Sequence, residues 1–196
     1  MKTSVKLIFK PYPKQRANWL EAFLQARRLE RLWCGYEMVA LASFLMHTGL
    51  AFRDKRITIY VGADIQTHSG DSGHAMQITY NSFGYSDSDD ELMRTLLHEL
   101  AHRLVMGNGI RSKQEEYTYL RNLLAHKRIY LFLYDVEADV LGEEVASEDV
   151  ASTLQWSKRA FGNAWDWALA KTYDERQQAI RRMIRRGNPR VATLVQ

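Results

Sequence analysis

Residues 91–106, ELMRTLLHELAHRLVM, are the stretch around which the rest of the chain is arranged. Their apolar members recur every three or four residues, which is typical of a helix with one buried stripe. The serine and aspartate residues at 86–90 can cap a helix N-terminus, and Glu91 suits its positive end. Gly107 and Gly109 favour termination after Met106. The pattern therefore predicts a helix over residues 91–106.

His98, Glu99 and His102 within this helix form the pattern HExxH. Two residues four apart lie on one helical face, so both imidazoles can reach the same ion. Neutral imidazole nitrogen is a preferred ligand of zinc, and a catalytic zinc ion has three protein ligands and one position open to water. Glu99 lies beside the pair and can accept a proton from that water. The pattern therefore predicts a zinc site with Glu99 as the general base.

A third ligand is expected from residues 129–146, IYLFLYDVEADVLGEEVA, which are apolar on most sides yet include Asp135, Glu137 and Asp139. A buried carboxylate is costly unless it is paired or bound to metal. Asp135 and Asp139 are one helical turn apart, whereas Glu137 points about 160° away from them. We therefore favour Asp135 as the third ligand, with Glu137 and His126 as alternatives.

The order of these features resembles that of the zincin metallopeptidases, in which strands precede an HExxH helix and a later helix supplies an acidic ligand. The stretch Asp135-Val136-Glu137-Ala138-Asp139 is similar to the third motif of gluzincins. In that motif a Glu ligand is followed four residues later by an Asp that supports a zinc-bound histidine. Asp139 matches this Asp, whereas Asp135 stands where Glu is usual. The metzincin pattern is not matched, because Asn108 occupies the position of its third histidine.

The resemblance covers roughly residues 57–142 and implies a hydrolase that cleaves peptide bonds of a protein or peptide substrate. Glu99 would pass a proton from the zinc-activated water to the leaving nitrogen. The strand at 75–80 would pair with the extended substrate. A tyrosine or histidine that stabilises the oxyanion is also expected. Its candidates are Tyr117, Tyr119, His126 and Tyr134.

Periodicity elsewhere predicts the remaining elements. Short runs of β-branched and aromatic residues predict strands at 4–9, 57–61 and 75–80. Helical spacing predicts helices at 14–33, 36–47, 113–126 and 129–146, with Gly35 between the first two, and a further helix or helix pair at 149–171. With the zincin resemblance, this order predicts an α+β fold: a small mixed or antiparallel sheet packed on the HExxH helix, with a mainly helical remainder.

Two of these helices have unusual compositions. The helix at 36–47 is nearly all apolar, so Met38, Met46 and His47 are expected in the core or at its edge. The segment at 149–171 carries four large aromatic residues, which we interpret as core. They are Trp156, Phe161, Trp165 and Trp167.

Length and composition set further limits. A chain of 196 residues, 46% hydrophobic and 26% charged, is typical of a folded soluble protein with one domain over 1–196. Cys34 is the single cysteine, which excludes an intrachain disulfide and fits a cytoplasmic location. No signal peptide is recognisable, and no run approaches 18 apolar residues, so a membrane segment is not expected.

Two other functions remain open. The net charge of +4 does not by itself indicate nucleic acid. However, residues 174–190, DERQQAIRRMIRRGNPR, carry six arginines and are predicted as a solvated amphipathic helix that could contact phosphates. The chain could instead be an interaction protein that keeps a zincin fold without useful catalysis. Glu99 argues against that reading, since binding alone needs no general base.

Overall fold

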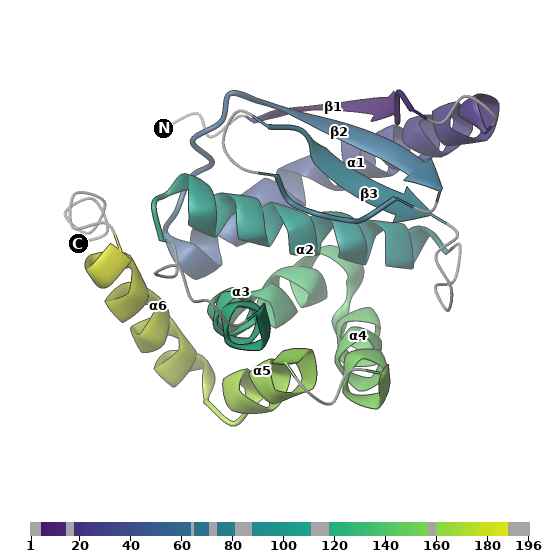
Figure 1. The fold of residues 1–196 in the computed structure, drawn as a ribbon. Coiled ribbons are helices and arrows are strands. Elements are labelled where there is room, and N and C mark those ends of the chain that lie inside the picture. Colours follow the sequence, from purple (N-terminus) through teal and green to yellow (C-terminus); the bar gives the residue numbers. More distant parts are fainter. Residues whose placement is uncertain are drawn as a thin grey trace.

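The computed structural model describes residues 5–14, 18–63, 65–70, 74–80, 88–110, 118–156 and 160–187. Three strands and six helices are found in these residues, which confirms the α+β class (Figure 1). In chain order they are β1 (Lys6–Pro11), α1 (Trp19–Thr48), β2 (Arg56–Ala63), β3 (Met76–Tyr80), α2 (Asp89–Gly107), α3 (Thr118–Leu141), α4 (Glu143–Trp156), α5 (Ala160–Leu169) and α6 (Tyr173–Gly187). No helix of the described ranges is long and apolar enough to cross a bilayer.

The sheet is parallel, with the strand order β1-β2-β3. The expectation of a mixed or antiparallel sheet is therefore wrong. Lys6 is in register with Arg56, and Ile59 with Met76. The long helix α1 connects β1 to β2, and a helical crossover of this kind joins parallel neighbours. Alternation of apolar residues indicates one buried face but does not define the direction of the neighbouring strand.

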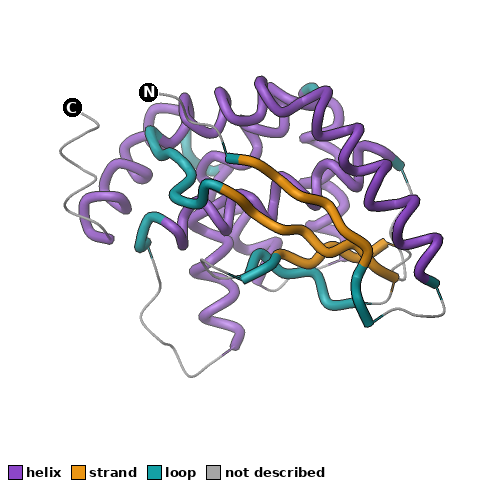
Figure 2. Tube along the Cα trace, turned by 90° about the horizontal axis from the view of Figure 1, so that it is seen from above, coloured by secondary structure: helices purple, strands orange, loops and turns teal. Residues whose placement is uncertain are grey.

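The helices lie on one face of the sheet, and Figure 2 shows the strands as a layer above them. Ile57, Ile59 and Val61 of β2 point into the core, whereas Thr58 and Tyr60 lie on the opposite, partly exposed face. Below the sheet, α3 is the central helix, in contact with α1, α2, α4, α5 and α6. Side chains on several sides of α3 therefore meet other helices.

Helix α1 is one continuous helix of 30 residues rather than two. A glycine inside a helix costs only about 1 kcal/mol relative to alanine, so Gly35 does not end it. The helix packs through one stripe, and the expected burial of Met38 and Met46 is wrong: they are 81% and 63% exposed. His47 is buried as expected, and Cys34 is exposed and free.

Helix α3 is also continuous, in place of the two helices predicted at 113–126 and 129–146. Residues 111–117 lie outside the described ranges, so the start of the first prediction is not tested. The helix ends at Gly142, whose φ of 98° favours glycine. Because no break follows His126, the angular positions of all its side chains are related by a single helical repeat.

Helix α2 forms as predicted. The Ser88 side chain caps it by accepting a hydrogen bond of 3.1 Å from the Glu91 amide. Arg103, on the buried side of α2, donates to both carboxylate oxygens of Asp54, at 2.9 and 3.1 Å, and to the His74 carbonyl at 3.0 Å. Arg103 therefore ties the segments before β2 and before β3 to the helix that carries HExxH.

Candidate metal centre

Three histidines from two helices converge at one point. The Nε2 atom of His126 on α3 lies 3.3 Å from the Nε2 atoms of both His98 and His102 on α2. One nitrogen from each of the three lies within 4.8 Å of the others. Two nitrogens bound to one tetrahedral zinc ion would be about 3.3–3.4 Å apart. The group can therefore hold a metal ion.

A backbone contact fixes the tautomer of His126. Its Nδ1 atom lies 2.7 Å from the Asn122 carbonyl oxygen, which can only accept, so Nδ1 carries the proton. The lone pair is then on Nε2, the atom that faces the other two histidines. Such a hydrogen bond on the far nitrogen is the usual support of a metal-binding imidazole.

Burial keeps the three imidazoles in the neutral form. It lowers the pKa of His102 to about 3 and that of His126 to about 4, with the proximity of the two rings adding to the effect at His102. The pKa of His98 is also lowered, by burial first and then by the other two histidines. Metals bind neutral imidazole, so protons do not compete for these nitrogens at neutral pH.

Glu99 follows His98 in α2, and only 9% of the residue is exposed. Burial raises the pKa of its carboxyl group to about 8. A divalent cation nearby favours the carboxylate form and opposes this effect of burial. The group can therefore exchange a proton close to neutral pH, which a general base requires.

Aromatic side chains form one wall of the group. Tyr130 lies one turn after His126, with its ring 5.4 Å from that imidazole and 5.9 Å from His98. Trp165 of α5 stacks on Tyr130 at 3.8 Å, and Phe161 lies 4.3 Å from His126. The burial of Trp165 confirms the core interpretation, whereas Phe161 also contacts the candidate site. The i, i+4 spacing of His126 and Tyr130 was the sequence signal for this contact.

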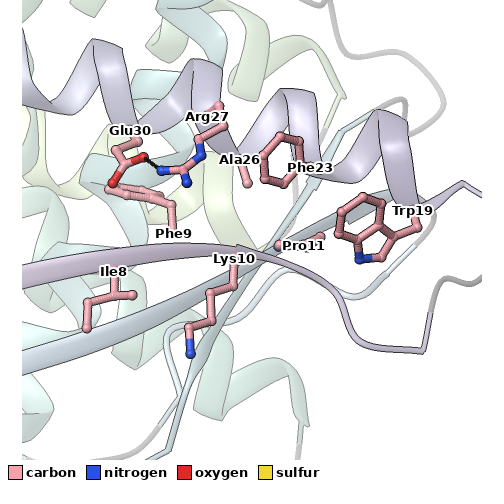
Figure 3. A pocket seen from close by; sticks show the side chains of 9 residues that line it. All are labelled: Ile8, Phe9, Lys10, Pro11, Trp19, Phe23, Ala26, Arg27 and Glu30. Carbon is pink, nitrogen blue, oxygen red and sulfur yellow. Dashed lines mark hydrogen bonds and ion pairs between the residues drawn. The ribbon is translucent and has the colours of Figure 1, made fainter.

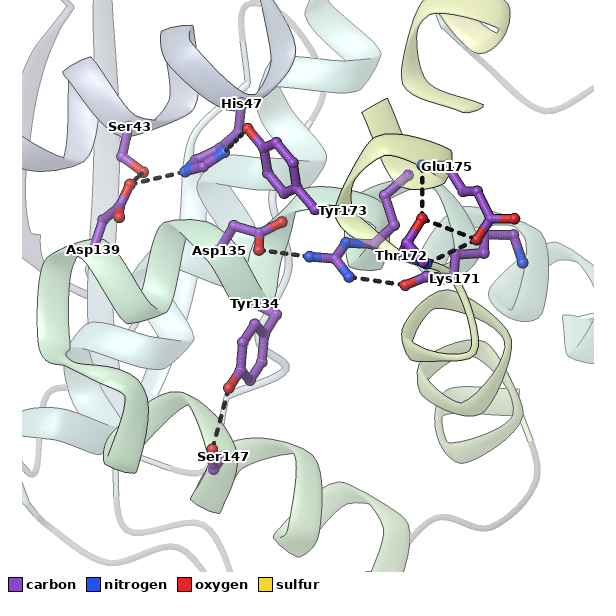
Figure 4. Close-up of polar contacts among 11 residues, drawn as sticks. Ser43, His47, Tyr134, Asp135, Asp139, Ser147, Lys171, Thr172, Tyr173 and Glu175 are labelled. Carbon is purple, nitrogen blue, oxygen red and sulfur yellow. Dashed lines mark hydrogen bonds and ion pairs between the residues drawn. The ribbon is translucent and has the colours of Figure 1, made fainter. Parts of the chain in front are cut away.

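Two carboxylates of α3, those of Asp135 and Asp139, bond to residues outside the histidine group (Figure 4). Asp135, our favoured third ligand, accepts a hydrogen bond of 2.6 Å from Arg176 of α6. Asp139 accepts from Ser43 at 2.7 Å and lies 2.8 Å from the Nε2 atom of His47, both on α1. Asp135 and Asp139 therefore join α3 to α6 and to α1, and neither supports a histidine of the group.

Glu137, the alternative ligand, is also outside the histidine group. It is 1% exposed, and its pKa is raised by burial and by Asp149, with Arg94 acting in the opposite direction. On a continuous helix Glu137 shares the face of His126 but lies about 16 Å further along the axis. Asp135 lies about 180° from His126 around that axis. Helix geometry thus accounts for the convergence of His126, and not of either carboxylate, with the α2 pair.

The outer edge of β3 is not open to a peptide where the structure describes it. The amide of Gln77 donates to the His68 carbonyl at 2.9 Å, and the His68 amide donates back at 3.0 Å. The Thr79 amide donates to the Thr67 hydroxyl at 3.0 Å. The chain's own segment thus occupies the edge that the resemblance assigned to a substrate.

Of the four expected oxyanion-stabilising residues, the structure describes the side chains of His126 and Tyr134. The Tyr134 hydroxyl lies 3.3 Å from the Ser147 hydroxyl of α4. His126 belongs to the histidine group. Tyr117 and the side chain of Tyr119 fall outside the described residues, as does the side chain of Trp156. Tyr130, which is not among the predicted candidates, has a ring that contacts the group.

Comparisons of the chain with protein-family models, with curated proteins and with solved structures found no match. The kind of site can therefore be inferred only from the side chains that form it. These residues are three neutral imidazoles that can hold a metal ion, with one buried carboxyl group beside them in the sequence.

Proposed function

We propose that the protein is a zinc-dependent metallopeptidase of the zincin type. His98, His102 and His126 hold the ion, and Glu99 is the general base. The observation that carries the proposal is the convergence of three imidazole nitrogens, two of them from an HExxH helix. Three protein ligands and a remaining open position are typical of catalytic rather than structural zinc.

The chain's residues divide the work of hydrolysis in this proposal. A zinc ion held by the imidazoles would polarise the scissile carbonyl and lower the pKa of a water molecule to about 7. Glu99 accepts the proton of that water and delivers it to the leaving nitrogen. Tyr130, Phe161 and Trp165 form an apolar wall that strengthens electrostatic interactions by limiting the access of bulk water.

The experiment compares wild type with Glu99→Gln, using zinc analysis and cleavage of casein or a quenched peptide library. The amide keeps the shape of the side chain but cannot accept the proton, so we expect zinc to remain while hydrolysis falls by at least about 100-fold. Glu148→Gln, on the exposed surface of α4, is the matched control. Equal turnover of wild type and Glu99→Gln would refute the role of Glu99.

A second candidate rests on α6. Arg181, Arg182, Arg185 and Arg186 are exposed on this helix, whose other face buries Ile180 and Ile184. A row of exposed arginines suits phosphate groups. Binding of a duplex RNA that weakens with salt and is lost when these four arginines become glutamine would favour this candidate. Binding unaffected by the substitutions would exclude α6 as a nucleic-acid surface.

A further inference from the structure

The two edges of the sheet differ. At the β3 edge the outward amides of Gln77 and Thr79 are bonded to residues 67–68. On the other side of the sheet, the amides of Lys6 and Tyr12 donate to the carbonyl oxygens of Lys55 and Val61, and these bonds join β1 to β2. Successive residues of a strand point their backbone groups to opposite sides, so the even-numbered residues of β1 face β2.

The N–H and C=O groups of Leu7 and Phe9 therefore point away from the sheet. They form no backbone hydrogen bond with another residue of the described ranges. Pro11, which lacks an N–H group, has the same outward orientation, and proline is tolerated at such an edge position. Within the described residues, β1 is thus an edge strand with two pairs of hydrogen-bonding groups that have no backbone partner, which is the template that an added strand requires.

A groove of about 360 Å³ lies between this edge and α1 (Figure 3). Residues 8–11 of β1 all line it, and because side chains alternate, the strand backbone itself must border the space. On the α1 side Trp19 and Phe23 stack with ring centroids 5.3 Å apart, and Trp19 is 50% exposed. The β1–α1 groove thus offers an aromatic surface next to the free backbone edge.

Lys10 in the groove and Lys6 on the same strand add positive charge. Arg27 lies over the Phe23 ring and pairs with Glu30. Lys6 and Lys10 are exposed on the open face of the sheet, and neither has an ion-pair partner among the described residues. A strand beside β1 would place every second side chain next to these lysines and the alternate ones above the aromatic pair.

We propose that the β1–α1 groove binds an extended peptide segment of a partner protein by strand addition. The segment alternates acidic residues, which face Lys6 and Lys10, with apolar residues, which contact Trp19 and Phe23. A second copy of β1 is the less favourable occupant, because it would bring the same lysines opposite one another. This site lies at the sheet edge opposite β3, and it does not depend on the proposed peptidase activity.

The test uses a fluorescently labelled octapeptide in which aspartate and phenylalanine alternate, with a chelator present so that bound metal does not contribute. We expect a Kd on the order of 10–100 µM by anisotropy. Trp19→Ala should weaken binding by about tenfold or more, and Lys10→Glu several-fold. Met38→Ala, an exposed apolar change on α1 outside the groove, should have no effect.

Two further arms use wild-type protein and are therefore independent of folding defects in the variants, and a third reverses the charges of both partners. N-methylation of the peptide amides should abolish binding to wild type, since strand addition needs those groups. Hydrogen exchange should slow at the Leu7 and Phe9 amides on peptide binding. A peptide with lysine in place of aspartate should bind Lys10→Glu better than wild type.

Absence of saturable binding up to about 1 mM peptide would overturn the proposal. So would binding that is indifferent to N-methylation and to Trp19→Ala. Light scattering that finds a dimer, disrupted by Trp19→Ala, would assign the edge to a second copy and would also overturn it.

Discussion

The Nε2 atoms of His102 and His126 lie 3.3 Å apart, although 24 residues and a change of helix separate them. His126 is held from behind by the Asn122 carbonyl, and His102 is part of the HExxH face of α2. Two neutral imidazoles at this distance place their Nε2 atoms where one metal ion could contact both. The α2–α3 contact therefore brings together the three histidines that could hold a metal ion.

The first prediction separates His126 from Asp135. His126→Ala should reduce bound zinc to near the background level, because two imidazoles alone make a poor site. Asp135→Ala should leave zinc bound but destabilise the fold, because it leaves Arg176 buried without its carboxylate. Elemental analysis and thermal unfolding of both variants measure the two effects. Loss of zinc from Asp135→Ala with retention in His126→Ala would restore Asp135 as the ligand.

The second prediction concerns pH and the metal-free protein. Unfolded histidine has a pKa near 6.5, whereas in the fold the pKa is about 3 for His102 and about 4 for His126. The unfolded chain therefore binds more protons at acidic pH. The contribution of these two histidines to the free energy of unfolding is complete above about pH 6.5. It is lost as the pH falls toward their pKa values in the folded state.

Chemical unfolding between about pH 7.5 and 4.5 measures this dependence. We expect wild type to lose stability more steeply than His102→Gln with His126→Gln, whose side chains do not titrate. Identical slopes would show that the rings of His102 and His126 are not kept neutral by burial.

The third prediction concerns the ion pair of Arg103 and Asp54. Arg103 is 2% exposed, so Asp54→Ala leaves a buried guanidinium without its carboxylate. We expect Asp54→Ala to lower the free energy of unfolding by roughly 3–5 kcal/mol. This lowers the Tm by roughly 6–20 °C in a chain of this size. Asp89→Ala, which removes a surface pair with Arg28, is the control and should cost at most about 1 kcal/mol. Equal effects would contradict a structural role for Arg103.

The fourth prediction is a stabilising change. Burial raises the pKa of Asp149 to about 6, although Arg94 acts in the opposite direction. The folded state then binds more protons than the unfolded state between about pH 4 and 6, so stability falls as pH rises through that range. Asp149→Asn removes this loss. It should raise the free energy of unfolding by roughly 2–3 kcal/mol at pH 7, but change it little near pH 4. A variant less stable than wild type at pH 7 would contradict this account.

Most elements could be read from local patterns, but the break at Gly142, inside the helix predicted at 129–146, was missed. Two breaks were also predicted where none occurs. Gly35 does not interrupt α1, and the segment after His126 does not interrupt α3. In both cases packing along one stripe outweighs a weak local preference. The second error affected the site, because a separate helix at 129–146 leaves His126 without a defined orientation relative to Asp135.

The sequence by itself determined the α2 helix, the shared face of His98 and His102, and the position of Glu99 beside them, because helical spacing depends only on neighbours. Only the tertiary structure decided that His126 completes the group and that Asp135 pairs with Arg176. It also decided that the sheet is parallel, with β1 as its open edge among the described residues. These features depend on which elements pack together, and such long-range contacts leave no periodic signal in the chain.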